Sequence, residues 1–220
     1  MANRLSRSAT GYMIFIAIIT WLSLALQLYI MTGNKLSNGF ALFVATCNFF
    51  SYFTVLTNLL VALSLSFILL RPSSSLVQFF SKPATLSAIT LYIFIVGLTY
   101  NMLLRTTWAP RGVQKWVDEA LHVFVPLLFI VFWAVFVPKG SLKWTHPFRW
   151  LIYPVIYLTY ALLRGEFTGF HAYPFINTAQ LGYGRVLLNA GGLMIVLIVS
   201  GLIIVGVDKL MSRSQRRVFS

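Results

Sequence analysis

Apolar and polar positions follow one another along this chain in long blocks. Extended apolar runs are separated by short segments rich in glycine, proline, serine and charged residues, which favour turns and loops. A helical run of about 20 apolar residues matches the hydrocarbon thickness of a lipid bilayer. The pattern predicts six membrane-spanning helices, at about residues 10–31, 47–70, 84–104, 119–137, 148–163 and 185–207.

These runs predict an all-α fold, the helix bundle of a polytopic integral membrane protein. The runs and their short connections fill the 220 residues, so residues 1–220 are expected to form a single transmembrane domain. The first run is too long for the apolar segment of a secretory signal peptide, and it lacks a small-residue cleavage pattern. We expect it to be retained as a helix.

The composition favours burial in lipid over a large water-soluble core. Hydrophobic residues make up 59% of the chain and the mean hydropathy is +0.83, whereas soluble domains contain about 45–50% apolar residues. The formal net charge of +13 would suggest nucleic acid as a partner of a soluble protein. Because the basic residues lie between the apolar runs, we expect membrane lipids as partners and no nucleic acid.

The distribution of lysine and arginine predicts the orientation in the membrane. Six spans place both termini on one side, and that side would carry eleven basic residues: Arg4, Arg7, Arg71, Lys82, Lys139, Lys143, Arg149, Lys209, Arg213, Arg216 and Arg217. The other side would carry six: Lys35, Arg105, Arg111, Lys115, Arg164 and Arg185. The positive-inside rule then predicts a multi-pass protein of the plasma membrane with both termini in the cytoplasm.

Polar residues gather at the opposite, outer face of the predicted bundle. Three of the four acids and two of the three histidines lie on that side. Ionisable groups are costly to place in or beside a membrane, so their clustering predicts a functional site. The candidate residues are Thr54, Thr57, Asn58, Asn101, Arg105, Asp118, Glu119, His122, His171 and Tyr173.

Asp118 and His122 carry the clearest chemical pattern among these residues. They are four positions apart, so on a helix they share one face, and the carboxylate can accept a proton from one imidazole nitrogen. The other nitrogen would then be free to act as a base. A threonine hydroxyl needs such a base to become a nucleophile, and Thr54 or Thr57 would supply it from a neighbouring helix.

Each of these residues also has a structural interpretation. Threonine in a membrane helix usually bonds to its own backbone or to another helix. His122 and Asp118 would form a buried structural pair, and Glu119 would favour the positive end of a helix dipole. The single Cys47 and three separated histidines give no metal-ligand spacing, so no metal or other cofactor is predicted.

Four local patterns resemble a known family, and they occur in the same order over nearly the whole chain. They are Phe49 to Asn58, Leu121-His122 followed by Pro126, Trp150 to Pro154, and Arg164-Gly165 leading to Tyr173-Pro174-Phe175. With these patterns the chain resembles a bacterial family of six-helix integral membrane proteins that are related to the eukaryotic androgen-induced proteins. His171-Ala172 and Asn177 depart from the family pattern around the last of them.

The resemblance implies a fatty-acid ester hydrolase. The eukaryotic relatives cleave fatty-acid esters of hydroxy fatty acids with an essential threonine and histidine, which match Thr54 and His122 here, with Thr57 as the alternative threonine. Asp118 would orient the imidazole. The substrate contacts expected around this pair are Thr57, Asn58, Asn101, Arg105, Glu119, His171 and Tyr173.

Three functional hypotheses remain open from the sequence. The first is a hydrolase that takes a lipid or acyl ester from the outer leaflet, with Asn58, Asn101 or a backbone amide as oxyanion donor. The second is a protein that binds or transports a lipid or small amphiphile without cleaving it, in which His122 and Asp118 form a polar lock or proton relay. The third is an assembly or signalling subunit. The oligomeric state is left open.

Overall fold

The computed structural model describes residues 6–70, 74–107 and 109–218, and all regular secondary structure in these residues is helical. Two short segments, η1 and η2, have π-helical geometry, and η3 is a 3₁₀ turn. The elements are α1 (Arg7–Ser37), α2 (Leu42–Phe49), α3 (Phe53–Leu70), α4 (Ser75–Phe80), α5 (Pro83–Thr99), η1 (Tyr100–Leu104), α6 (Val113–Glu119), η2 (Ala120–Phe124), α7 (Val125–Phe136), α8 (His146–Trp150), α9 (Ile152–Thr168), η3 (Pro174–Ile176) and α10 (Thr178–Val218).

Five helical segments in the described part of the chain have the length and apolarity needed to cross a bilayer. They are α1, α3, α5 with η1, the continuous α6–η2–α7 segment, and α10 as far as Ser212. The predicted span at 148–163 falls on α8 and α9. With 17 residues, α9 is shorter than each of these five segments. The prediction of an all-helical fold is therefore confirmed in the described residues, and five of its segments are long and apolar enough to cross a membrane.

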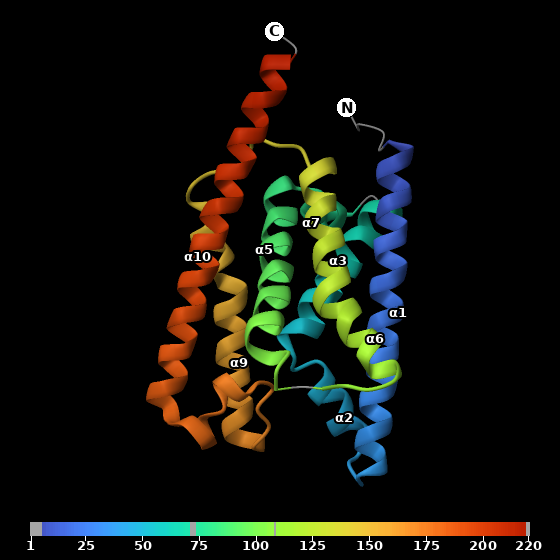
Figure 1. The fold of residues 1–220 in the computed structure, drawn as a ribbon, viewed down its shortest axis with the longest axis vertical. Helices are drawn as coiled ribbons and strands as arrows, with labels where there is room; N and C mark the ends of the chain where they lie inside the picture. The colour runs from blue at the N-terminus through green and yellow to red at the C-terminus, as the bar shows by residue number, and fades with distance from the viewer. Residues whose placement is uncertain (1–5, 71–73, 108, 219–220) are drawn as a thin grey trace.

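The helices form a bundle in which α3, α5 and α7 lie between α1 on one side and α9 with α10 on the other (Figure 1). The buried core between α1, α3, α5 and α7 contains Ile16, Leu65, Ile93 and Phe129. Large apolar side chains also cover the outside of the bundle: Leu22 on α1 is 65% exposed and Leu188 on α10 is 71% exposed. Such an apolar outer surface fits contact with lipid.

The first helix begins and the last helix ends at the same end of the bundle (Figure 1). The α7–α8 connection lies at this end, and Asp208 of α10 fixes it. The buried carboxylate of Asp208 accepts hydrogen bonds from the backbone N–H groups of Gly140 (3.0 Å) and Leu142 (3.2 Å). Asp208 therefore has a structural role. Among the basic residues predicted for this side, Arg4 and Arg71 lie outside the described residues.

The prediction of one helix over 47–70 is wrong, because the chain breaks between α2 and α3. The carbonyl of Cys47 receives the Ser51 hydroxyl (2.6 Å) and the Arg164 guanidinium (3.2 Å) in place of a helical amide. The Ser51 N–H bonds Asn48 instead, and the Ser51 carbonyl accepts from the Tyr157 hydroxyl (3.0 Å). Side chains from α9 thus donate hydrogen bonds to the backbone carbonyls left unpaired at the break. The helix α3 starts immediately before Thr54.

Other helix ends also differ from the predicted bounds. The first and last helices extend beyond 10–31 and 185–207, to Arg7–Ser37 and Thr178–Val218. The helix predicted at 119–137 begins at Val113. We expected Asp118 at the beginning of this helix. It lies instead more than one turn after the first helical residue.

Candidate functional site

A cavity lies between α3, α5, α9 and α10, towards the end of the bundle where α3 begins. It offers about 90 Å³ to the centres of water-sized molecules, several times the space that one water needs. Most of its walls are apolar side chains, including Ile95 on α5, Leu158 on α9 and Leu197 on α10. Of the residues predicted for the site, Thr54, His122 and Tyr173 line this cavity.

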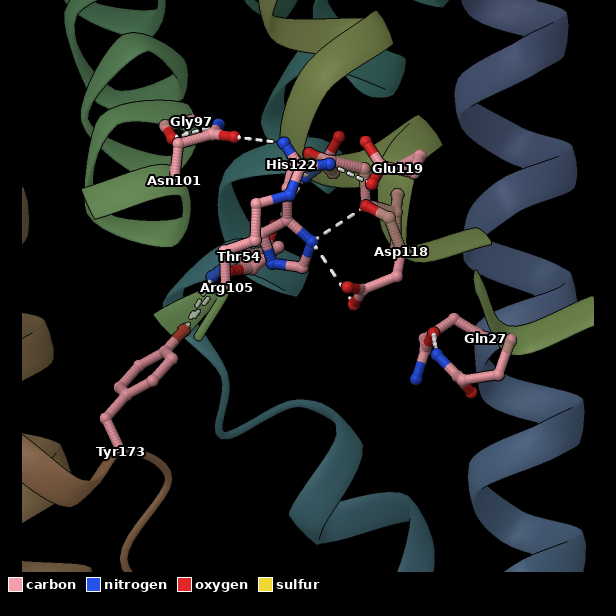
Figure 2. A network of polar contacts seen from close by, with 12 residues as sticks. Gln27, Thr54, Gly97, Asn101, Arg105, Asp118, Glu119, His122 and Tyr173 are labelled. Atoms are coloured by element: carbon pink, nitrogen blue, oxygen red, sulfur yellow. Dashed lines mark hydrogen bonds and ion pairs between the residues drawn. The ribbon is translucent and has the colours of Figure 1, made fainter. Parts of the chain in front are cut away.

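Thr54 lies in the first turn of α3 and is buried, with 7% of its surface exposed. Amides in the first turn of a helix have no intrahelical acceptor. The Thr54 N–H instead donates to the Tyr173 hydroxyl at 3.1 Å, and the same hydroxyl lies 3.2 Å from Thr54 Oγ1 (Figure 2). The break after α2 thus places the backbone and hydroxyl of Thr54 together at the cavity.

Tyr173 reaches the cavity from the connection between α9 and α10. Its ring stacks on Phe175 (5.2 Å between centroids) and meets Tyr52 edge to face (5.7 Å). Burial raises the pKa of the Tyr173 phenol to about 12, although its hydrogen bonds with Thr54 oppose this shift. The phenol therefore keeps its proton at neutral pH and is available as a hydrogen-bond donor.

His122 lies in η2 and is oriented by Asp118 one turn earlier (Figure 2). Its Nδ1 is 2.9 Å from the backbone carbonyl of Asp118 and 3.4 Å from the carboxylate Oδ1. Since a backbone carbonyl oxygen only accepts, Nδ1 is the donor nitrogen, and in the corresponding neutral tautomer Nε2 is the acceptor. The imidazole also stacks on the Tyr100 ring, with centroids 4.2 Å apart.

The π-helical turn that carries His122 follows from the proline at position 126. In η2 the N–H of Val125 bonds Ala120, five residues back. The carbonyl of Leu121 would then need the N–H of residue 126, which proline lacks. The amide of Asn58 on α3 supplies that donor at 3.2 Å. Asn58 therefore couples α3 to the turn that holds His122.

Gly97 allows α5 to pack closely against this π-helical turn. A Cβ atom at Gly97 would lie 3.1 Å from the His122 carbonyl oxygen and 3.4 Å from Pro126 Cβ. The first separation is tighter than most Cβ contacts, and the second is at the lower limit of ordinary van der Waals contact. A side chain at position 97 would push η2 away from α5, so glycine helps to set the position of His122.

Asp118 is buried, with 6% of its surface exposed. Its Oδ2 atom has no hydrogen-bond partner among the residues that the structure describes. The nearer acceptor of His122 is the Asp118 backbone carbonyl, at 2.9 Å from Nδ1, whereas the carboxylate Oδ1 is 3.4 Å away. The described residues contain no group of three or more His, Cys, Asp or Glu side chains arranged to hold a metal ion.

Asn101, Arg105 and Glu119 form a separate network beside the cavity and do not line it. Arg105 donates to Asn101 Oδ1 at 2.7 Å and pairs with the Glu119 carboxylate (Figure 2). Asn101 in turn donates to the Gly97 carbonyl at 2.8 Å. The network joins the end of α5 to the end of α6.

The remaining predicted residues also lie outside the cavity lining. Thr57 Oγ1 is 3.2 Å from the Tyr153 hydroxyl, and Asn58 donates to the Thr54 carbonyl at 2.9 Å. His171 packs against Gly165, and its Nε2 lies 3.1 Å from Thr178 Oγ1. The structure therefore does not bring His171 together with His122.

Sequence reasoning missed the tyrosines of α9. Tyr153, Tyr157 and Tyr160 reach Thr57, the Ser51 carbonyl and the Ser51 hydroxyl, respectively. Their spacing of four and three residues places them on one helical face, and this spacing was the available signal. Arg164, four residues after Tyr160, lies on the same face and donates to Asn48 Oδ1 at 2.7 Å.

Comparisons with known proteins give no relative for this chain. No family model, no curated protein and no solved structure matches it.

Proposed function

We propose that this protein is a membrane-embedded hydrolase of lipid or acyl esters, with Thr54 as nucleophile and His122 as base. One observation carries the proposal: a largely apolar cavity is lined by two threonines, Thr54 and Thr99, and by one imidazole, that of His122, and these residues come from different helical elements. The Asp118 carbonyl holds the imidazole in the tautomer that a base requires. The resemblance to the androgen-induced proteins supports the same pair of residues.

The reaction would proceed through an acyl-enzyme. Oγ1 of Thr54 adds to the ester carbonyl while its proton moves to Nε2 of His122. The tetrahedral intermediate collapses, the alkoxy group leaves and takes that proton, and the acyl group stays on Thr54. Water then attacks the acyl-enzyme with His122 again as base, releasing the fatty acid and restoring the threonine.

The topology that we propose has six spans, with α9 as the additional crossing. An even number of crossings agrees with α1 beginning and α10 ending at one end of the bundle (Figure 1). That end carries Lys82, Lys139 and Lys143, so the positive-inside rule places it in the cytoplasm. Thr54 would then face the outer leaflet, from which an ester would enter the cavity.

Turnover of an ester panel by the purified protein in detergent tests this function. The wild type should hydrolyse acyl esters, and Thr54→Ala and His122→Ala should each abolish turnover at unchanged thermal stability. Thr57→Ala is the matched control, because Thr57 is buried on the same helix but does not line the cavity. Full activity in both Thr54→Ala and His122→Ala would refute the mechanism.

A second candidate function is the binding of a lipid or amphiphile without cleavage. It is favoured by the partner of Thr54 Oγ1, which is the Tyr173 hydroxyl and not His122. Under this function the wild type would retain a long-chain fatty acid with a defined stoichiometry and would turn over none of the esters.

A further inference from the structure

The hydroxyl of Tyr173 meets Thr54 at two atoms that matter for acyl transfer. It lies 3.1 Å from the backbone nitrogen and 3.2 Å from Oγ1 (Figure 2). The backbone N–H is committed to no helical acceptor, because it lies in the first turn of α3. An oxygen atom is therefore already accommodated beside both the nucleophile and its own amide.

The position of a reacting ester oxygen follows from the bond that Thr54 would form. An acyl carbon attached to Oγ1 carries its negative oxygen on an adjacent bond, so groups that surround Oγ1 also surround that oxygen. Effective donors lie about 2.7–3.1 Å from the oxyanion. The N–H of the nucleophilic residue commonly serves as one such donor, and a second donor must come from elsewhere.

We propose that Tyr173 is this second donor, so that its phenolic O–H and the N–H of Thr54 together form the oxyanion hole. The assignment rests on the proposed hydrolase function and answers a question that the sequence left open, because Asn58 is occupied by the Thr54 and Leu121 carbonyls. Asn101 is turned to the Gly97 carbonyl.

The step conserves protons and charge. As Oγ1 adds, its proton passes to His122 and the carbonyl electron pair moves onto the substrate oxygen. Tyr173 points its O–H at that oxygen and keeps its proton, while the Thr54 N–H releases the Tyr173 oxygen and donates to the same anion. When the intermediate collapses, the Thr54 N–H again donates to the Tyr173 hydroxyl.

The phenol suits this task because it is partly buried and held by packing. Burial raises its pKa to about 12, so it donates a hydrogen bond without losing its proton at neutral pH. Its ring is fixed between Phe175 and Tyr52. Because the ring is held in place, only the hydroxyl group has to turn towards the oxyanion when charge develops.

Tyr173→Phe tests the assignment, because it removes the hydroxyl and keeps the ring. The matched control is Tyr153→Phe, which deletes a tyrosine–threonine contact of the same 3.2 Å length one turn further along α3 and outside the cavity lining. We expect Tyr173→Phe to lower kcat about 100- to 1000-fold with little change in KM or melting temperature. Tyr153→Phe should keep kcat within about threefold.

A trifluoromethyl ketone with an alkyl chain provides a second readout, because its hemiketal with Thr54 carries the same negative oxygen. Its inhibition constant should weaken in Tyr173→Phe by about the factor lost in kcat, and should not change in Tyr153→Phe. A merely structural tyrosine would raise KM and lower the melting temperature while leaving the affinity of the folded protein for the ketone unchanged, and this result would overturn the assignment.

The outcomes separate this inference from the function on which it rests. If Tyr173→Phe keeps kcat within threefold while Thr54→Ala is inactive, Tyr173 is not the donor and the hydrolase function stands. If the wild type cleaves no ester and does not bind the ketone, the function and the assignment both fall.

Discussion

Gly97 sets how closely α5 approaches the turn that carries His122. A methyl group there would lie 3.1 Å from the His122 carbonyl oxygen. We expect Gly97→Ala to destabilise the protein by about 1–3 kcal/mol, because overpacking forces the backbone apart. It should also lower ester turnover, because the displaced element holds His122, the proposed base.

Gly192→Ala on α10 is the control for this substitution. A Cβ at Gly192 meets nothing within 4 Å, so alanine should be neutral there or stabilise the helix slightly. Thermal unfolding in detergent measures both variants. Equal melting temperatures for Gly97→Ala and the wild type would show that the approach of α5 to η2 is not constrained in this way.

Lys139 makes stability depend on pH at the other end of the molecule. Its ammonium lies 4.2 Å from the centroid of the Trp133 ring and donates to the Val137 carbonyl at 2.6 Å. Burial lowers its pKa from the ordinary 10.5 to about 8, although the Asp208 charge opposes this shift. Between these two values the unfolded chain binds more protons, so folding stability should rise with pH there.

The variant Lys139→Met removes this titration. The difference in melting temperature, variant minus wild type, should be larger at pH 7 than at pH 10. The reason is that burying the charged ammonium destabilises the wild type only at the lower pH. The exposed Lys143 supplies the control variant Lys143→Met, which should show no such trend. A difference between Lys139→Met and the wild type that is constant over this range would refute the prediction.

At the scale of elements, α10 forms one wall of the cavity. Ala190, Leu193, Met194 and Leu197 recur at helical spacing along it. With a rise of about 1.5 Å per residue, this wall is roughly 10 Å long. Its length and apolar character suit a single acyl chain more than a bulky polar substrate.

Ala190→Phe should fill this wall and exclude long chains. The ratio of long-chain to short-chain ester turnover should fall at least about tenfold, because a well-packed interior does not yield to an added ring. Leu188→Phe is the control, since Leu188 is 71% exposed on the same helix. An unchanged chain-length profile in Ala190→Phe would show that the acyl chain does not lie along α10.

The elements also show how far a sequence can be interpreted. Long apolar runs predicted the helices, because only a buried or lipid-facing helix tolerates them. The break at Phe50–Tyr52 depends on α9 side chains that are distant in sequence, and apolarity continues through it. The π turn at His122 needs both Pro126 and Asn58, so no local pattern predicts it.

The same reasoning applies to the candidate site. Thr54, His122 and Tyr173 were predicted from polarity, helical spacing and family resemblance, and they line one cavity. His171 was predicted from its polarity and its place in the last outer loop, yet it packs on Gly165. Tyr173 and His171 both lie in the α9–α10 connection, and its path decides which side chain reaches the cavity. No pattern in the sequence predicts that path.

At the scale of the whole molecule, the proposed topology predicts which loops are accessible from outside the cell. Cys47 is the single cysteine, so a Cys47→Ser background accepts one new cysteine at a time. Ser37→Cys, at the end of α1, should react with a membrane-impermeant maleimide in intact cells. Ser141→Cys, in the α7–α8 connection, should react only after permeabilisation. The reverse pattern would invert the proposed orientation.

The central claim is that Thr54 is a nucleophile activated by His122. A fluorophosphonate with an alkyl chain forms a stable adduct with an activated hydroxyl, and mass spectrometry of the digested protein locates it. The account predicts one adduct on Thr54 in the wild type and in Thr57→Ala, and none on Thr54 in His122→Ala. A folded wild-type protein in which Thr54 stays unmodified would contradict it.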